Sequence, residues 1–392
     1  MWAYGSFGAF WGCWVVVFAD FLREHGITPD QASLQLTALS VSSVAVMTVV
    51  APRITRRARG PTIGVALVFH SVGALLIGVL PTGWLAGAFL VTGIGTGLID
   101  VFVNAAGQEL EERSDRPILQ WVHATYSLGG LAGALLTGAA LVAGASVGQV
   151  LGAAAALQLV AAAVNLRRAR SLPDPSRAGG PQTTISLGIF LRSPWLVAPA
   201  CVVLCSFFIE GSMDVWSVIY LRRTLGASVI GGSAGFAAFA LAMAIGRWFA
   251  ATVLFRTGYR RTILASGIGS MAAGVVAVLA RSPAVAGAAF LVLGFCIAAA
   301  APAAFGLAGR GGGPPGVAIA AMTTVGYTGF VVGPPVMGWL ADRAGLRATI
   351  VVLVAATAGI GLAGLLSGER APEVDDTGDS PDAPRLDEEA GV

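Results

Sequence analysis

The sequence has little charge and no lysine at all. Asp, Glu and Arg together make up 11% of its 392 residues, against about 25% in an ordinary soluble domain. Hydrophobic residues account for 56%, and the mean hydropathy is +0.78. A water-soluble fold of this size would lack the polar residues to cover its surface, so lipid is the expected solvent. The excess of arginine is then expected to anchor loops at a membrane rather than to bind nucleic acid.

Cysteine and histidine are also scarce. The four cysteines, at positions 13, 201, 205 and 296, lie inside apolar runs, where cysteine acts as a small hydrophobic residue. The sequence has no Cys-x-x-Cys motif, paired histidines or phosphate-binding loop. We therefore expect no metal, no cofactor and no coupling to ATP.

Two short motifs leave a membrane-embedded hydrolase as an alternative. Gly144–Gly148 and Gly231–Gly235 both match the Gly-x-Ser-x-Gly string of a nucleophile elbow. That elbow requires a strand that leads into a helix, whereas these segments lie in a predicted loop and at a predicted helix start. The prediction is that the protein is not an enzyme.

Apolar runs of membrane length recur along the chain, and a transmembrane helix needs about 20 such residues. They predict an all-α membrane protein with twelve spans. The expected spans are residues 3–22, 31–51, 62–80, 83–107, 119–143, 146–167, 194–220, 228–253, 262–280, 283–307, 314–340 and 347–367.

The spans divide into two sets of six. We predict an N-terminal six-helix bundle over 1–167, a polar linker over 168–193 and a C-terminal six-helix bundle over 194–367. Residues 368–392 hold nine of the 21 acidic residues and almost nothing apolar, so this tail is expected to be disordered.

Arginine placement predicts the orientation. With the N-terminus inside, sixteen arginines fall on the inner side and six on the outer side. By the positive-inside rule both termini and the linker are expected in the cytoplasm, in a multi-pass protein of the cell membrane. We expect a monomer.

The two halves share an internal repeat. Three glycines of the fifth span recur in the eleventh at an offset of 200 residues: Gly129, Gly133 and Gly138 correspond to Gly329, Gly333 and Gly338. An even number of spans per half gives parallel repeats, a transporter architecture in which the substrate site lies near the midplane between them.

The sequence resembles the major facilitator superfamily, and within it a bacterial branch of sugar-permease-like and uncharacterised inner-membrane permeases. The resemblance extends over nearly all of residues 1–367. The segments that carry it are Asp100–Asn104, Arg116–Gly133, Glu210–Arg222, Gly246–Arg247 and Gly326–Gly338. It implies two six-helix bundles and solute transport by alternating access.

The inner-loop arginines depart from the family pattern. The loop after the second span usually resembles Gly-x-x-x-Asp-Arg-x-Gly-Arg-Arg, but here the acid and both glycines are replaced within Ala51–Gly60. The corresponding loop of the second half has Phe255 in place of the acid. We still assign an inner gate to four arginines: Arg56, Arg59, Arg247 and Arg256.

Three carboxylates fall well inside predicted spans, where a charged side chain is costly and marks a functional site. Glu210 and Asp214 lie four residues apart on one helical face, and two carboxylates that close do not readily ionise together. Asp100 lies in the fourth span. We predict that all three bind the coupling proton, with hydration or pairing to Arg222 or Arg223 as the alternative for Glu210 and Asp214.

Polar and aromatic residues of the same spans are predicted to bind the substrate. They are Asn104, His123, Tyr126, Trp216, Trp14 and Tyr327. The aromatic residues of the first span could instead face lipid. His70 is expected to form a hydrogen bond between helices rather than to act in transport.

We therefore predict a secondary transporter that uses protons and moves a small molecule through the lipid bilayer. The sequence is compatible with two substrate classes, an amphipathic compound that is exported or a sugar-like solute that is taken up. The alternative function is a ligand sensor with a transporter fold.

Overall fold

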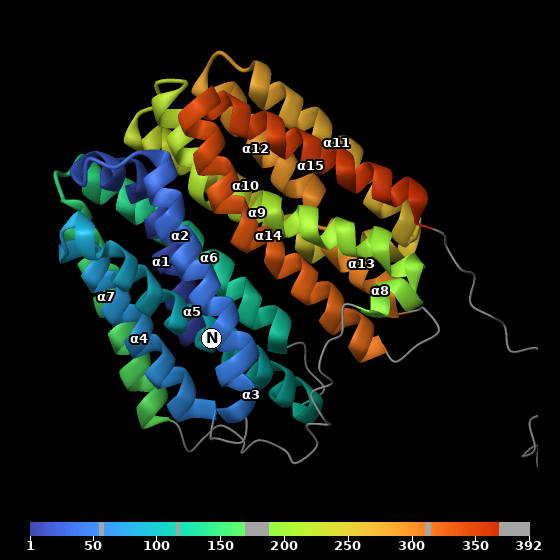
Figure 1. Ribbon diagram of the computed structural model, residues 1–392, viewed down its shortest axis with the longest axis horizontal. Helices are drawn as coiled ribbons and strands as arrows, with labels where there is room; N and C mark the ends of the chain where they lie inside the picture. The colour runs from blue at the N-terminus through green and yellow to red at the C-terminus, as the bar shows by residue number, and fades with distance from the viewer. Residues whose placement is uncertain (55–58, 115–117, 169–187, 310–314, 368–392) are drawn as a thin grey trace, which may run out of the picture.

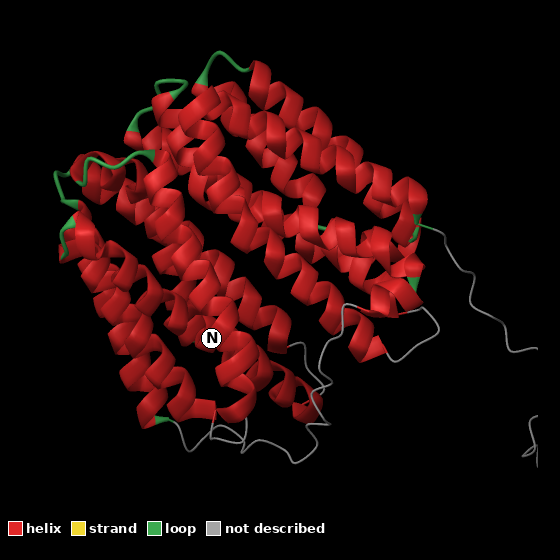
Figure 2. Ribbon diagram, viewed as in Figure 1, coloured by secondary structure: helices red, strands yellow, loops and turns green. Residues whose placement is uncertain are grey.

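The computed structural model describes residues 1–54, 59–114, 118–168, 188–309 and 315–367. Its regular elements are all helices, joined by short loops (Figure 2). The all-α prediction is confirmed for this part of the chain, because no strand occurs in it. The predicted tail lies outside the described residues.

The helices of the first half pack mainly against one another (Figure 1). They are α1 (Trp2–Glu24), α2 (Pro29–Ala45) with η1 (Val46–Val50), α3 (Ala51–Ile54), α4 (Arg59–Val79), η2 (Thr82–Trp84), α5 (Leu85–Ser114), α6 (Ile118–Val142) and α7 (Val147–Arg167).

The helices of the second half form a matching group. They are α8 (Gly188–Arg192), η4 (Pro194–Leu196), α9 (Val197–Arg223), α10 (Val229–Thr257), α11 (Tyr259–Leu279), α12 (Pro283–Ile297), α13 (Ala300–Gly309), α14 (Pro315–Ala344) and α15 (Leu346–Leu366).

The described residues contain eleven helical segments long and apolar enough to cross a membrane. One of them combines α12 and α13. Together with α14, which is 30 residues long, these segments give each of the twelve predicted spans a helical counterpart. The structure adds α8, a short helix inside the predicted linker.

Local sequence explains where several helices begin and end. Thr28 and Ser146 each form a capping box with the glutamine three residues later, which satisfies backbone N–H groups at the start of α2 and α7. Gly26 and Gly226 adopt positive φ angles of 62° and 71° in the turns after α1 and α9. These two turn glycines are also 200 residues apart, in register with the sequence repeat.

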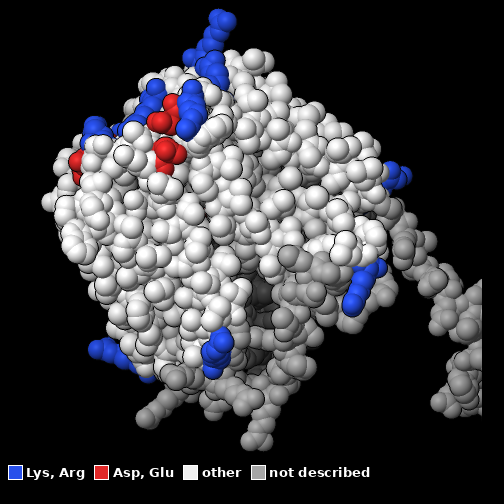
Figure 3. All heavy atoms as spheres, viewed as in Figure 1, with Lys and Arg blue, Asp and Glu red and all other residues white. Residues whose placement is uncertain are grey.

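The two groups of helices meet at one end and diverge at the other (Figure 1). We call the end with the turns after α1 and α9 the hairpin end, and the end with Met1, the last residues of α7 and the first residues of α9 the linker end. A hollow separates the two groups toward the linker end (Figure 3). On the face shown there, charged side chains lie at the ends, and the belt between them is uncharged.

Contact at the hairpin end follows the internal repeat. A Cβ added at Gly138 of α6 would lie 2.6 Å from Ser233 Oγ of α10. A Cβ added at Gly338 of α14 would overlap the Ser33 side chain of α2. Both pairs join the two halves, and Gly138 and Ser33 are each 200 residues from their counterparts. Small residues allow this close approach of helices in lipid.

We expect Gly338→Val to open the hairpin end. The new side chain would overlap Ser33 and would also meet the Pro29 carbonyl oxygen, so α2 and α14 would have to separate. Overpacking costs about 1–3 kcal/mol, a roughly 5- to 100-fold shift away from the closed contact. The measurement is the spin-label distance between Cys residues placed at exposed Trp84 and Arg281, in a protein whose four native cysteines are replaced by serine.

Gly152→Val in α7 is the matched control, since nothing lies within 4 Å of its Cβ position. An unchanged distance distribution in Gly338→Val, equal to that of Gly152→Val, would contradict the role given to this contact.

Candidate functional site

Asp100 of α5 joins the two halves near the middle of the molecule. Tyr4 Oη of α1 donates to Asp100 Oδ1 at 2.8 Å, and Asn104 Nδ2 donates to the same oxygen at 3.2 Å. Tyr327 Oη of α14, in the other half, donates to Asp100 Oδ2. An ionised carboxylate only accepts hydrogen bonds, so all three donors suit the charged form.

His123 and Tyr126 of α6 extend this cluster. His123 Nε2 lies 2.9 Å from Asn104 Oδ1, and the His123 ring meets Tyr4 edge to face with centroids 5.3 Å apart. The ring of Tyr126 lies 5.1 Å from that of Tyr4. Five predicted site residues therefore form one cluster with Tyr4: Asp100, Asn104, His123, Tyr126 and Tyr327.

Glu210 and Asp214 of α9 line a second polar region on the other side of Tyr126. Both oxygens of Glu210 lie 2.9 Å from Nη2 of Arg247 in α10. Asp214 shares a pocket with this ion pair and with Tyr126. Within the described part of the chain, Asp214 has neither a hydrogen-bond nor an ion-pair partner.

The pocket beside Asp214 lies between the halves. The first half contributes small and aromatic residues, and the second contributes the charges and an apolar wall. The lining residues are Gly8, Trp11, Gly12, Tyr126, Ser127, Gly130, Glu210, Asp214, Phe236, Phe239, Ala240, Met243 and Arg247. It is thus formed by α1, α6, α9 and α10.

The structure does not bring Trp14 and Trp216 into this pocket. Both indoles are 1% exposed and pack in the apolar core, Trp14 against Phe89 and Trp216 edge to face against Phe18. Trp11, one helical turn before Trp14, lines the pocket instead.

The predicted gate arginines do not form one cluster among the described residues. Arg247 pairs with Glu210 inside the polar region, and Arg256 is exposed nine residues further along α10, near its linker end. Arg56 lies outside the described residues, and only the backbone of Arg59 is described.

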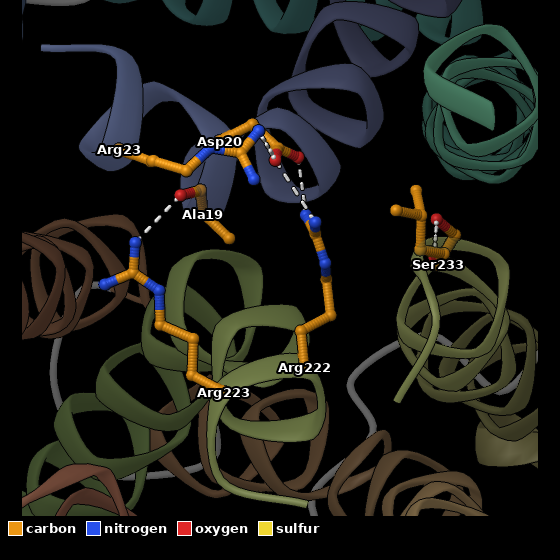
Figure 4. A network of polar contacts seen from close by, with 7 residues as sticks. Ala19, Asp20, Arg23, Arg222, Arg223 and Ser233 are labelled. Carbon is orange, nitrogen blue, oxygen red and sulfur yellow. Dashed lines mark hydrogen bonds and ion pairs between the residues drawn. The ribbon is translucent and has the colours of Figure 1, made fainter. Parts of the chain in front are cut away.

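Arg222 and Arg223 do not pair with Glu210 or Asp214, which was the alternative to proton binding by these two acids. Arg222 contacts the Asp20 carboxylate with two nitrogens, at 2.6 and 3.2 Å, and so connects α9 to α1 (Figure 4). Arg23 lies 2.7 Å from the same carboxylate, and Arg223 Nη2 donates to the Ala19 carbonyl oxygen at 2.9 Å. We call this group the hairpin-end ion cluster.

His70 forms the predicted hydrogen bond between helices. Its Nδ1 lies 2.9 Å from Gln158 Oε1, which joins α4 to α7. The rings of Phe7 and Phe10 meet it edge to face, so it is part of the packed interior of the first half.

Sequence reasoning missed Tyr4 and the Asp20–Arg222 pair, and it selected Trp14 rather than Trp11 among the aromatic residues of the first span. Tyr4 and Trp11 are seven residues apart, which places them on one face of α1, but Phe7 and Trp14 have the same spacing, so spacing alone does not select that face. Asp20 was recognisable as an acid at the end of a span, but nothing in the sequence indicates that Arg222, 202 residues away, is its partner.

Two groups of membrane-length helices with carboxylates, arginine and tyrosines between them form the architecture of a membrane transporter. The comparisons with known proteins agree. Residues 1–334 match the Major Facilitator Superfamily, so the chain belongs to that family. It is a multi-pass membrane protein and a secondary transporter, not an enzyme.

The chain is 30% identical to an uncharacterized MFS-type transporter of Yersinia pestis, over 69% of this chain and 71% of that protein. Its fold is similar to that of the nucleoside transporter NupG, with a TM-score of 0.74, 11% identity and coverage of 94% and 98%. A bacterial homolog of the human lysosomal transporter Spinster, solved inward-facing and unoccupied, gives a TM-score of 0.73 at 15% identity, with coverage of 93% and 95%. These structural similarities concern the fold alone.

Proposed function

We propose that this protein couples the movement of a small solute across the bacterial cell membrane to protons, with Asp100, Glu210 and Asp214 as the coupling residues. The observation that carries the proposal is the position of these carboxylates between the two halves. Asp100 accepts hydrogen bonds from tyrosines of both halves, and Glu210 and Asp214 face α6 of the first half through the shared pocket.

Protonation of Asp100 would alter the contact between the halves. The neutral carboxyl carries a proton of its own on one oxygen and accepts hydrogen bonds more weakly than the carboxylate. The hydroxyls of Tyr4 and Tyr327 would then hold it less strongly, and the halves would separate more readily at this level. A proton can thereby shift the balance between two conformations, as a ligand does when it binds one of them better.

The described conformation corresponds to one step of alternating access. The ion cluster and the serine–glycine contacts close the hairpin end, and the hollow lies toward the linker end. With both termini and the linker in the cytoplasm, as the arginine distribution indicates, this state is open to the cytoplasm. We further propose that a monomer carries out the cycle.

Asn104, His123, Tyr126 and Tyr327 are proposed to line the solute path. They surround Asp100 at the level where the two halves meet. Arg247 would hold the charge of Glu210 rather than act as an inner gate, since its guanidinium is already paired.

The test uses purified protein in liposomes that contain a pH-sensitive dye. Organic cations, sugars and other small solutes are first screened for exchange of labelled against unlabelled solute, and the exchanged solute is then applied across a pH gradient. We expect this solute to drive proton movement at least 10-fold faster than in liposomes without the protein.

Asp214→Asn should abolish that proton movement, whereas Asp342→Asn, at an exposed position of α14, should leave it intact. Exchange of a solute with no accompanying proton movement in the wild type would contradict the proposal.

A further inference from the structure

The pocket beside Asp214 holds a carboxyl group that has no hydrogen-bond or ion-pair partner among the described residues. Glu210 is neutralised by Arg247, because both of its oxygens lie 2.9 Å from the same guanidinium nitrogen. Asp214 has no such partner within the described part of the chain, although it shares the pocket with that ion pair. An ionised carboxylate away from bulk water is costly unless a cation or hydrogen-bond donors compensate for it.

The rest of the pocket wall suits an apolar cation. Trp11, Phe236, Phe239 and Met243 line it, and aromatic faces attract ammonium groups. Apart from the charged residues, the hydroxyls of Tyr126 and Ser127 and the indole N–H of Trp11, the lining side chains are apolar. A sugar presents hydroxyls on every side and would leave most of them without hydrogen bonds here.

The size of the pocket limits what it can enclose. It has a volume of about 50 Å³, well below the roughly 300–1,000 Å³ of pockets that bury a drug-sized ligand. It can therefore enclose at most a small charged head group, while the body of the ligand would lie outside it.

We propose that the transported solute is an organic cation, whose ammonium head binds Asp214 against the aromatic wall formed by Trp11, Phe236 and Phe239. This inference rests on the proposed function, because it names the substrate class of that same site. It disfavours anions, since the Arg247 guanidinium already pairs with Glu210 and the Asp214 carboxylate would repel them. It also favours the amphipathic solute over the sugar-like one among the two alternatives that the sequence left open.

The probe is benzyltrimethylammonium, which has a small head, a single ring and a charge that does not change with pH. Its binding to the purified full-length protein is measured by calorimetry, next to phenylacetate and glucose. We expect saturable binding of the cation, at least 10-fold tighter than that of either comparator.

Variants test the role of the carboxylate. Asp214→Asn should weaken cation binding at least 10-fold, Asp214→Glu should retain it within about 3-fold, and Trp11→Ala should weaken it several-fold. Asp342→Asn is the matched control and should bind as the wild type does. If Asp214→Asn does not fold, the Asp214→Glu and Trp11→Ala variants still test the site.

Binding should also tighten several-fold between pH 5.5 and pH 8.5, because a proton competes with the cation for Asp214. The other charged or titratable groups facing Asp214 are Glu210 on α9, Arg247 on α10 and Tyr126 on α6, and α1 contributes none to the pocket lining.

Equal binding of phenylacetate or glucose, or unchanged cation binding in Asp214→Asn, would overturn the inference. So would the absence of cation binding by the wild type. Failure of the proposed function can be distinguished from failure of this inference. If another solute moves with protons, only the cation assignment is lost, whereas if the cation binds and exchanges without protons, only proton coupling is lost.

Discussion

Replacement of Asp20 by alanine should shift the protein from the conformation closed at the hairpin end toward one that is open there. Asp20 connects α1 to α9 through Arg222, and its side chain is 7% exposed against 14% for that of Arg222. Removing one partner of a largely buried ion pair costs about 3 kcal/mol or more, because the other charge is left without compensation. Opening the hairpin end returns Arg222 to water, so the population of the open form should rise roughly 100-fold.

The hairpin-end spin-label pair defined above measures this shift. Asp20→Ala and Arg222→Ala should each lengthen the distance, and the double variant should add little to either, because both remove the same contact. Asp342→Ala is the control for the loss of a carboxylate at this end. Fully additive effects of the two single substitutions would show that the Asp20–Arg222 ion pair does not hold α1 and α9 together at the hairpin end.

Asp100→Asn should destabilise the described conformation through the loss of the contact with Tyr327. A hydrogen bond to a charged group contributes about 1.5–3 kcal/mol, so the equilibrium should move roughly 10- to 100-fold. The asparagine keeps the size of the side chain and can still accept a hydrogen bond, but it has only one neutral acceptor for the two tyrosine hydroxyls.

Tyr327→Phe is the matched variant for that prediction. It removes the hydroxyl and keeps the ring, which packs near Phe207 and Phe330. The two variants should give similar distance distributions at the linker end, measured between labels at exposed Arg167 and Phe255, and their combination should not be additive. Wild-type distributions in Asp100→Asn would refute the link between the halves at this residue.

Hydrophobicity predicted the fold well because lipid imposes simple conditions. A spanning segment must be apolar and must satisfy its own backbone hydrogen bonds, so twelve apolar runs indicated twelve helices. The structure adds the break between α12 and α13 and the short helix α8. Their lengths fall below what a hydropathy pattern resolves.

The site was harder to predict, because its contacts depend on which helices are neighbours. The acids could be found from the sequence, since charge inside a span is conspicuous. Their partners could not: Asp100 meets Tyr327, 227 residues away, and Glu210 meets Arg247 on the next helix. Helical spacing also could not choose between Trp11 and Trp14, because each lies on a face of α1 that could line a cavity.

The central claim is that protonation of embedded carboxylates determines which end of the protein is open. The most direct test measures both label pairs, at the hairpin end and at the linker end, on wild type and Asp100→Asn in lipid nanodiscs at pH 8.5 and pH 5.5. In the wild type, acidification should lengthen the hairpin-end distance and shorten the linker-end distance together, and Asp100→Asn should resemble the acidic state at both pH values. Distances that do not respond to pH in the wild type would contradict the account, and a full response that survives in Asp100→Asn would contradict the role given to Asp100.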